Sequence, residues 1–167
     1  GCYSQTNEEA KNLEGVDILI GNGNKKKAIR LLEEKLQFND NEKQVDILDI
    51  LNHHIYEQLD ITTFDHTRAF VKIEDGCENF CTYCIIPYAR GGLRSKDENE
   101  TIKEITTLVN NGYKEIVLTG IHTGRYGIDI NTTLEELLEE LVKIQDIYRM
   151  RLSSIEINEI TPKIIKL

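Results

Sequence analysis

The second half of the chain alternates short apolar runs with longer amphipathic segments. The apolar runs at 69–73, 115–119 and 150–154 have the length of buried strands. Between them, apolar residues recur at helical spacing from about 95 to 111 and from about 132 to 144. Strand–helix repeats of this length predict parallel strands joined by right-handed crossovers. We therefore expect an α/β fold that forms the start of a β/α barrel or of a doubly wound sheet.

The two amphipathic segments carry signals for helix ends. The first helix is expected to start at Ser95 or Asp97 and to stop at Gly112. In the second, Thr132-x-x-Glu135 has the form of a capping box. The expected apolar stripes are Ile102, Ile105, Leu108 and Val109 in the first helix, and Leu134, Leu137, Leu138, Leu141 and Ile144 in the second. The glutamates of the second helix, Glu135, Glu136, Glu139 and Glu140, are expected to form a solvated face and not a catalytic carboxylate pair.

The first 63 residues have a weaker pattern. A short helix is expected from Thr6 or Asn7 to Asn12, followed by a strand at 16–20 and a helix over about 25–35. The turn Gly21–Asn24 lacks a complete phosphate-loop pattern and is expected to be an ordinary strand-to-helix turn. Residues 36–67 are expected to be mostly a linker, with a candidate strand at 45–50. The sequence thus divides into one unit at 1–63 and another at 64–167.

Charge and hydropathy limit the classes of partner. The 167 residues carry a net charge of −9, from 20 Lys+Arg and 29 Asp+Glu. This charge argues against this chain as the main nucleic-acid-binding surface, because contacts with phosphates need a basic surface. A local basic cluster, Arg90, Arg94 and Lys96, is either a solvated loop end or a local contact with RNA. No apolar run has the roughly 20 residues needed to cross a bilayer, and the first residues do not form a signal peptide. No membrane partner is expected.

Three of the chain's four cysteines, Cys77, Cys81 and Cys84, fall in a single C-x3-C-x2-C stretch. Thiolates this close together favour a soft metal, either zinc or an iron–sulfur cluster. Structural zinc requires four ligands, and the fourth cysteine, Cys2, lies far upstream. Three thiolates on a four-iron cluster leave one iron open to a substrate or cofactor. A zinc loop and a disulfide-bonded loop remain alternatives, and metal-binding cysteines favour a reducing compartment.

The stretch from Ala69 to Gly91 resembles the radical S-adenosylmethionine (SAM) enzymes, in their methylthiotransferase branch. The resemblance is carried by the cysteine spacing, by Tyr83 before the last cysteine, and by Ile85-Ile-Pro-Tyr-Ala-Arg-Gly91. Together with Leu118–Gly127, it is most similar to the enzymes that act on threonylcarbamoyladenosine in tRNA. The alternatives are methylthiolation of isopentenyladenosine or of a ribosomal protein, or a non-catalytic iron–sulfur or zinc-binding module. Lys96 departs from the family, which usually has arginine there.

The resemblance implies a fold and a set of cofactor ligands. The fold would be about half of a partial β/α barrel, preceded by the tail of an α/β N-terminal methylthiotransferase domain. The three clustered cysteines would hold a four-iron cluster whose open iron binds SAM. Cys2, in Gly1-Cys-Tyr-Ser-Gln5, would be one ligand of a second, auxiliary four-iron cluster. No catalytic residue is expected beyond these ligands, and the residues expected to contact SAM at the strand ends are Thr119, Gly120, Ser153, Ser154 and Glu156.

The resemblance also implies partners and surroundings for the protein. The substrate would be a tRNA, the electron donor a flavodoxin or ferredoxin, and the location the cytoplasm. The chain does not begin with Met, and it ends just after Thr161-Pro162, which has the form of a helix start. We therefore expect the sequence to be a fragment of a longer protein.

Overall fold

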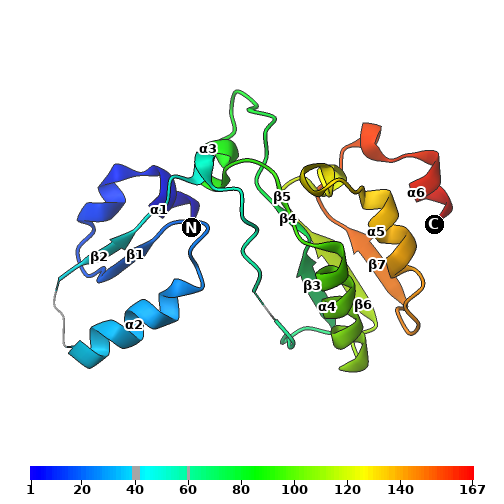
Figure 1. Ribbon diagram of the computed structural model, residues 1–167, viewed down its shortest axis with the longest axis horizontal. Helices are drawn as coiled ribbons and strands as arrows, with labels where there is room; N and C mark the ends of the chain where they lie inside the picture. The colour runs from blue at the N-terminus through cyan, green and yellow to red at the C-terminus, as the bar shows by residue number, and fades with distance from the viewer. Residues whose placement is uncertain (39–41, 60) are drawn as a thin grey trace. The chain divides into compact units, whose positions relative to one another are not determined.

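The computed structural model describes residues 1–38, 42–59 and 61–167 (Figure 1). The chain forms two compact units, the first made of residues 1–59 and 76–92 and the second of residues 60–75 and 93–167. The sequence-based division of the chain into domains after residue 63 stays a prediction. The cysteine-bearing segment 76–92, however, belongs to the first unit, whereas the sequence pattern placed it in the second. The assignment of residues 1–63 to an N-terminal methylthiotransferase domain stays a prediction.

The second unit is built on a three-stranded parallel sheet. Its strands are β3 (Arg68–Lys72), β6 (Glu115–Thr119) and β7 (Arg149–Leu152), in the order β3-β6-β7. Both pairings are parallel, with Ala69 beside Ile116 and Ile116 beside Met150. The predicted α/β class and the three predicted strands are therefore confirmed, with small shifts at the ends. Closure of the sheet into a barrel stays a prediction.

Two helices, α4 (Glu98–Asn110) and α5 (Leu134–Leu141), cover one face of this sheet (Figure 1). Asp97 caps α4, since its carboxylate accepts a hydrogen bond from the Glu100 N–H at 3.1 Å. Thr133 caps α5 by accepting from the Glu136 N–H at 3.2 Å. The predicted capping box at Thr132 is thus wrong by one residue, because it is Thr133 that has the extended backbone of a cap.

The core lies between the sheet and these two helices. Alternate residues of the strands point toward the helices, so that Ala69 and Val71 of β3 and Ile116 and Leu118 of β6 are buried. The helix residues of this core are Ile105, Leu108 and Val109 of α4 and Leu134, Leu137, Leu138 and Leu141 of α5, with Ile102 and Ile144 packed against it. The apolar stripes predicted from helical spacing are confirmed.

Leu137→Ala is expected to lower the free energy of unfolding of the second unit by about 2–5 kcal/mol, because Leu137 is 0 % exposed and its removal leaves a cavity. Val142→Ala, at a position 51 % exposed just after α5, should change it by no more than about 0.5 kcal/mol. Urea unfolding followed by circular dichroism measures both variants. Equal effects of the two substitutions would contradict this description of the core.

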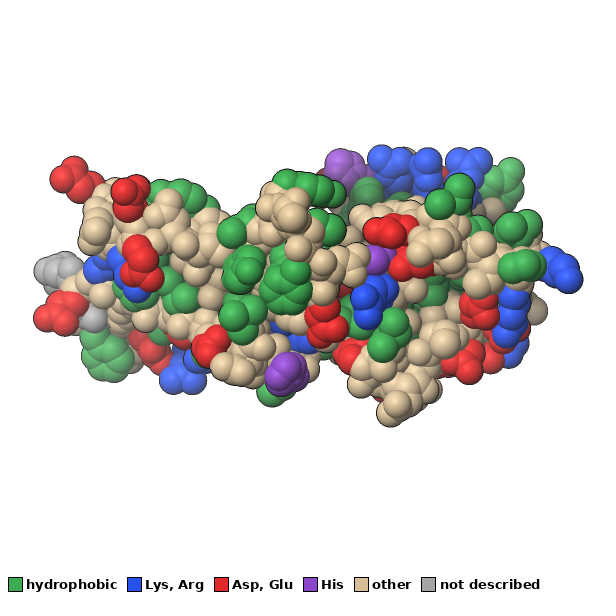
Figure 2. Space-filling view, turned by 90° about the horizontal axis from the view of Figure 1, so that it is seen from above, with side chains coloured by type: hydrophobic (Ala, Val, Ile, Leu, Met, Phe, Trp, Pro, Cys, Tyr) green, Lys and Arg blue, Asp and Glu red, His purple; other side chains and the backbone are tan. Residues whose placement is uncertain are grey.

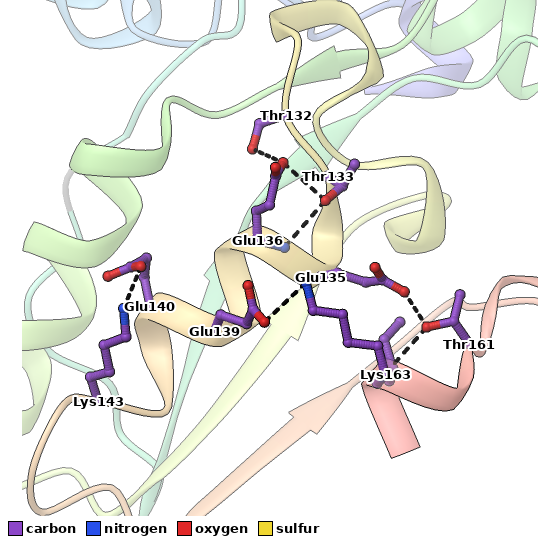
Figure 3. Close-up of polar contacts among 10 residues, drawn as sticks. Thr132, Thr133, Glu135, Glu136, Glu139, Glu140, Lys143, Thr161 and Lys163 are labelled. Atoms are coloured by element: carbon purple, nitrogen blue, oxygen red, sulfur yellow. Dashed lines mark hydrogen bonds and ion pairs between the residues drawn. The ribbon is translucent and has the colours of Figure 1, made fainter. Parts of the chain in front are cut away.

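The polar face of α5 is held by neighbouring side chains (Figure 3). Its glutamates are exposed or half-buried, as predicted for a solvated face. Glu139 pairs with Lys163 at 2.9 Å, and Glu140 pairs with Lys143 at 2.5 Å. Glu135 bonds to Thr161, and Glu136 accepts from Thr132 at 3.0 Å. Two of these contacts tie α5 to α6 (Pro162–Lys166), whose predicted cap is confirmed because the Thr161 hydroxyl accepts from the Ile164 N–H.

Shorter elements complete the second unit. The strands β4 (Glu74–Asp75) and β5 (Arg94–Ser95) pair antiparallel, with Asp75 opposite Arg94. This pairing joins the residues just before the cysteine-bearing segment 76–92 to the residues just after it. The single-turn 3-10 helices are η3 (Thr123–Arg125), η4 (Ile128–Ile130) and η5 (Ile157–Glu159).

The first unit contains a two-stranded parallel sheet and several short helices. Its elements are α1 (Cys2–Thr6), η1 (Glu8–Asn12), β1 (Ile18–Ile20), α2 (Lys27–Phe38), β2 (Gln44–Asp46), η2 (Ile50–Asn52) and α3 (Ile86–Arg90). The predicted strand at 16–20 and helix at 25–35 correspond to β1 and α2, whereas the expected helix ending at Asn12 is the 3-10 helix η1. The predicted linker at 36–67 contains β2 and η2, and its residues 39–41 and 60 lie outside the described residues.

In the part of the chain that the structure describes, no helix has both the length and the apolar character needed to cross a bilayer.

Seen from above, acidic and basic side chains are interspersed with polar and apolar ones (Figure 2). This mixed surface agrees with the charged fraction of 29 % in the sequence.

Candidate functional site

The cysteine loop, defined as residues 76–92, starts with a constrained glycine. Gly76 has φ of 87°, and a Cβ at this position would collide with the backbone carbonyls of Gly91 and Gly92. The next residue, Cys77, donates its N–H to the Gly91 carbonyl at 3.0 Å. The loop is therefore pinched at its base by backbone contacts that only glycine allows.

The three loop cysteines are free thiols, with Cys81 exposed and Cys77 and Cys84 half-buried. A turn joins the last two, because the Cys84 N–H donates to the Cys81 carbonyl at 2.9 Å. Among the described residues, no three Cys, His, Asp or Glu side chains are gathered so that they could hold a metal ion. Metal-binding loops commonly take up their ligand geometry together with the metal. The assignment of these thiols as cluster ligands stays a prediction.

The loop leads directly into α3, which reaches Cys2. The side chain of Arg90, the last residue of α3, donates from Nε to the Cys2 sulfur at 3.4 Å. Asn22 donates from Nδ2 to the Ala89 carbonyl at 2.6 Å and lies 3.9 Å from the same sulfur. The turn at Gly21–Asn24 therefore contacts Cys2, which its sequence pattern did not indicate. Hydrogen bonds to sulfur are among the contacts that tune iron–sulfur clusters, but a ligand role for Cys2 stays a prediction.

The five residues predicted to contact SAM lie at the carboxyl end of the parallel sheet. Thr119 ends β6, and a Cβ on Gly120 would collide with the carboxylate of Glu74. The Ser153 N–H donates to the Leu118 carbonyl at 3.1 Å. The remaining two are in the loop after β7, where Ser154 accepts from Thr123 and the Glu156 N–H donates to Glu159. The structure thus brings these segments to one edge of the sheet, and their contact with SAM stays a prediction.

Three polar residues at the same edge were not singled out from the sequence. Glu74 is 0 % exposed, and its Oε1 accepts the His122 N–H at 2.5 Å. The imidazole Nε2 of His122 lies 2.7 Å from the Glu159 Oε1. Each residue follows one of the three parallel strands, where functional groups of β/α folds gather. That position was the available signal, but nothing in the local sequence linked the three.

Comparison with known proteins addresses the family directly. Residues 71–167, more than half of the chain, match the family model described as the radical SAM superfamily. The chain belongs to the radical SAM superfamily. The use of a four-iron cluster and SAM follows from this membership.

Among curated proteins, the chain is similar to relatives whose names describe the modification of tRNA. It is 44 % identical to threonylcarbamoyladenosine tRNA methylthiotransferase MtaB of Bacillus subtilis over 99 % of this chain and 37 % of the relative. It is 40 % identical to the protein of the same name from Aquifex aeolicus, over 100 % of this chain and 41 % of the relative. It is 36 % identical to tRNA-2-methylthio-N(6)-dimethylallyladenosine synthase of Natranaerobius thermophilus, over 90 % of this chain and 34 % of the relative. The chain thus spans well under half the length of these relatives.

The donor set of the loop fits a radical SAM cluster. Three free thiols lie on one short loop, and thiolates are the ligands that iron–sulfur clusters use. Four aromatic or apolar side chains near them are largely exposed, namely Phe80, Tyr83, Ile85 and Tyr88. The rings of Phe80 and Tyr88 pack edge to face with centroids 5.7 Å apart. Such a surface can exclude water from a bound cofactor.

The buried Glu74 has a raised proton affinity. Burial raises its pKa to about 7, although the hydrogen bond from the His122 N–H opposes the shift. Its second oxygen, Oε2, is buried without a hydrogen-bond partner among the described residues. The carboxyl group is therefore largely protonated below neutral pH, whereas in the unfolded chain it ionises near pH 4.5.

Glu74→Gln is expected to reduce the pH dependence of stability. The folded state holds this proton up to about pH 7 and the unfolded state releases it near 4.5, so the free energy of unfolding falls as pH rises between these values. The fall from this group is at most about 3 kcal/mol and should be absent in Glu74→Gln. Urea unfolding at pH 5, 6, 7 and 8 measures it, with exposed Asp65→Asn as the control. The same slope in wild type and Glu74→Gln would contradict the buried-acid assignment.

The predicted basic cluster after the cysteine loop is wrong as a solvated group for Arg94 and Lys96, whereas Arg90 is half-buried and contacts Cys2. Arg94 is 3 % exposed and Lys96 only 2 % exposed. The Lys96 ammonium pairs with Glu104 of α4, and its backbone carbonyl accepts from the Tyr126 hydroxyl at 2.8 Å. These side chains are turned into the second unit because β5 pairs with β4 there. A buried, paired lysine is a structural group, so the departure from arginine at residue 96 has no bearing on RNA contact.

Proposed function

We propose that this protein is a tRNA methylthiotransferase that adds a 2-methylthio group to N6-threonylcarbamoyladenosine next to the anticodon. The observation that carries the proposal is the C-x3-C-x2-C loop of free thiols within a chain 44 % identical, over nearly its whole length, to a threonylcarbamoyladenosine tRNA methylthiotransferase. A second relative of the same name, 40 % identical over the whole chain, supports the same substrate.

The chain's own residues would bind and orient the reactants. Cys77, Cys81 and Cys84 would hold a four-iron cluster, and the segments around Thr119–Gly120 and after β7 would bind SAM at the sheet edge. When bound, the cluster and SAM would supply the radical chemistry that removes hydrogen from an aromatic carbon, which no side chain can do. The exposed rings around the thiols would shield that chemistry from water.

Further cofactors and partners belong to the same proposal. Cys2, already hydrogen-bonded by Arg90, would be one ligand of a second four-iron cluster that delivers sulfur. The full reaction would also need a tRNA and a low-potential electron donor such as flavodoxin or ferredoxin. A tRNA substrate and free thiols support a cytoplasmic location. The N-terminal unit would be the end of a methylthiotransferase domain, and the parallel sheet the start of a partial β/α barrel.

The second candidate is methylthiolation of isopentenyladenosine in tRNA. It is supported by 36 % identity to a tRNA-2-methylthio-N(6)-dimethylallyladenosine synthase over 90 % of this chain. The relatives named above are tRNA enzymes, which places both nucleosides ahead of a ribosomal protein as substrate. The higher identity to the threonylcarbamoyladenosine enzymes favours the first candidate.

The test is anaerobic reconstitution with iron and sulfide, followed by reaction with SAM, dithionite and tRNA. The proposal expects iron in multiples of about four per chain, formation of 5′-deoxyadenosine, and a 2-methylthio product found by mass spectrometry of nucleosides. Two tRNA substrates, one carrying threonylcarbamoyladenosine and one isopentenyladenosine, decide between the candidates. Zinc uptake without iron would overturn the proposal, and product on the second tRNA alone would transfer it to the alternative.

A further inference from the structure

One chain of polar contacts crosses the carboxyl edge of the parallel sheet in the second unit. We call it the edge network and define it as Glu74, His122 and Glu159. Glu74 lies just beyond β3, His122 is in the loop after β6, and Glu159 ends η5 after β7. The His122 backbone N–H bonds to Glu74 at 2.5 Å, and its imidazole lies 2.7 Å from Glu159. One histidine therefore joins the loops that follow three neighbouring strands.

The edge network reaches the segments assigned to SAM under the proposed function. The second oxygen of Glu159, Oε2, accepts the Glu156 N–H at 2.9 Å. Thr123, the neighbour of His122, donates to the Ser154 carbonyl through its N–H at 2.8 Å and through its hydroxyl at 3.0 Å. The close approach of Gly120 to the Glu74 carboxylate brings the end of β6 into the same set of contacts.

The contact between His122 and Glu159 is sheltered from solvent. Their side chains are 9 % and 17 % exposed, respectively. Charge and hydrogen-bond interactions are stronger in such surroundings than at an open surface, and loss of one partner leaves the other buried and uncompensated. The Nε2 and Oε1 atoms are within hydrogen-bonding distance, but they are not aligned as a hydrogen bond. The close approach nevertheless fixes the imidazole beside Glu159, whose other oxygen accepts the Glu156 N–H.

We propose that His122 and Glu159 are positioning residues that hold the loops after β6 and β7 in the geometry that binds SAM. The inference rests on the proposed function, because it takes these loops as the SAM-binding segments. Neither residue needs to touch SAM, since each acts through the backbone and side chains that it fixes. Misplacement of binding groups by about 1 Å can reduce activity by roughly a hundredfold. Loss of the contact between His122 and Glu159 should therefore produce a measurable decrease in the affinity for SAM.

The test measures SAM binding to the reconstituted full chain by equilibrium dialysis with radiolabelled SAM. His122→Leu removes the imidazole but keeps the backbone bond to Glu74, and it should raise the Kd for SAM roughly tenfold. His122→Gln keeps a donor toward Glu159 and should restore most of the affinity. His66→Leu, at an exposed histidine before β3 and so at the opposite edge of the sheet, is the matched control and should leave the Kd unchanged.

A double-mutant cycle separates positioning from a general loss of stability. Glu159→Ala alone should weaken binding as much as His122→Leu, and the double variant should be no worse than either. Iron content and melting temperature are recorded for every variant. Unchanged SAM affinity in His122→Leu, with a lower melting temperature, would overturn the inference. If that variant does not fold, Glu159→Ala decides by the same criterion. Failure of the wild-type protein to bind SAM would instead overturn the proposed function.

Discussion

Cys81→Ser is expected to abolish reductive cleavage of SAM. Cys81 is exposed at the centre of the loop, and a serine hydroxyl at this position cannot replace a thiolate ligand of iron. Formation of 5′-deoxyadenosine should fall below detection, and the bound iron should decrease by the content of one cluster, about four irons per chain. Liquid chromatography of the SAM products and colorimetric iron analysis measure both quantities.

Two matched variants define what this loss means. Thr82→Ser changes the exposed neighbour of Cys81 and should retain full cleavage. Cys2→Ser should also retain cleavage, because Cys2 is assigned to a second cluster and not to the cluster that binds SAM. A Cys81→Ser protein that still forms 5′-deoxyadenosine would refute the assignment of the loop thiols as cluster ligands. Cleavage lost equally in Cys2→Ser would refute the separation of roles.

Gly76→Ala is expected to disrupt the base of the cysteine loop. Its φ of 87° disfavours any side chain, and the added Cβ would collide with the backbone carbonyls of Gly91 and Gly92, which cannot rotate away. We expect a loss of about 3 kcal/mol or more in local or global stability. The amide hydrogen of Cys77, which bonds to the Gly91 carbonyl, should then exchange much faster with solvent.

Gly112→Ala measures the effect of a left-handed backbone conformation in the absence of a steric collision. Gly112 has φ of 96° but open space around the position of a Cβ, so alanine there should lower stability by only about 1 kcal/mol. Hydrogen exchange followed by mass spectrometry, together with urea unfolding, compares the two variants. Equal effects of Gly76→Ala and Gly112→Ala would show that the contacts at the loop base do not constrain residue 76.

The effects expected for Cys81→Ser and Gly76→Ala both concern the cysteine loop. The cysteine motif of this loop can be recognised in the local sequence, whereas the conformation of its base cannot. The spacing of Cys77, Cys81 and Cys84 and the residues up to Gly91 were sufficient to indicate the family, because a cluster-binding motif is a local run of residues. The pinch at Gly76 was not visible in that run. It depends on the two carbonyls of Gly91 and Gly92, 15 and 16 positions further along the chain, which the fold brings back to the loop base.

The sequence alone determined the three parallel strands, the helices α4 and α5 and the apolar core of the second unit, together with the iron–sulfur motif. Periodicity of two or of 3.6 residues decides which side chains face the core, and this information lies within a few residues of each position. The tertiary structure alone decided the burial of Lys96, the contact of Arg90 with Cys2 across 88 positions and the bond of His122 to Glu74 across 48. Contacts of this kind depend on which loops the packed sheet brings together, and local residue patterns carry no record of that arrangement.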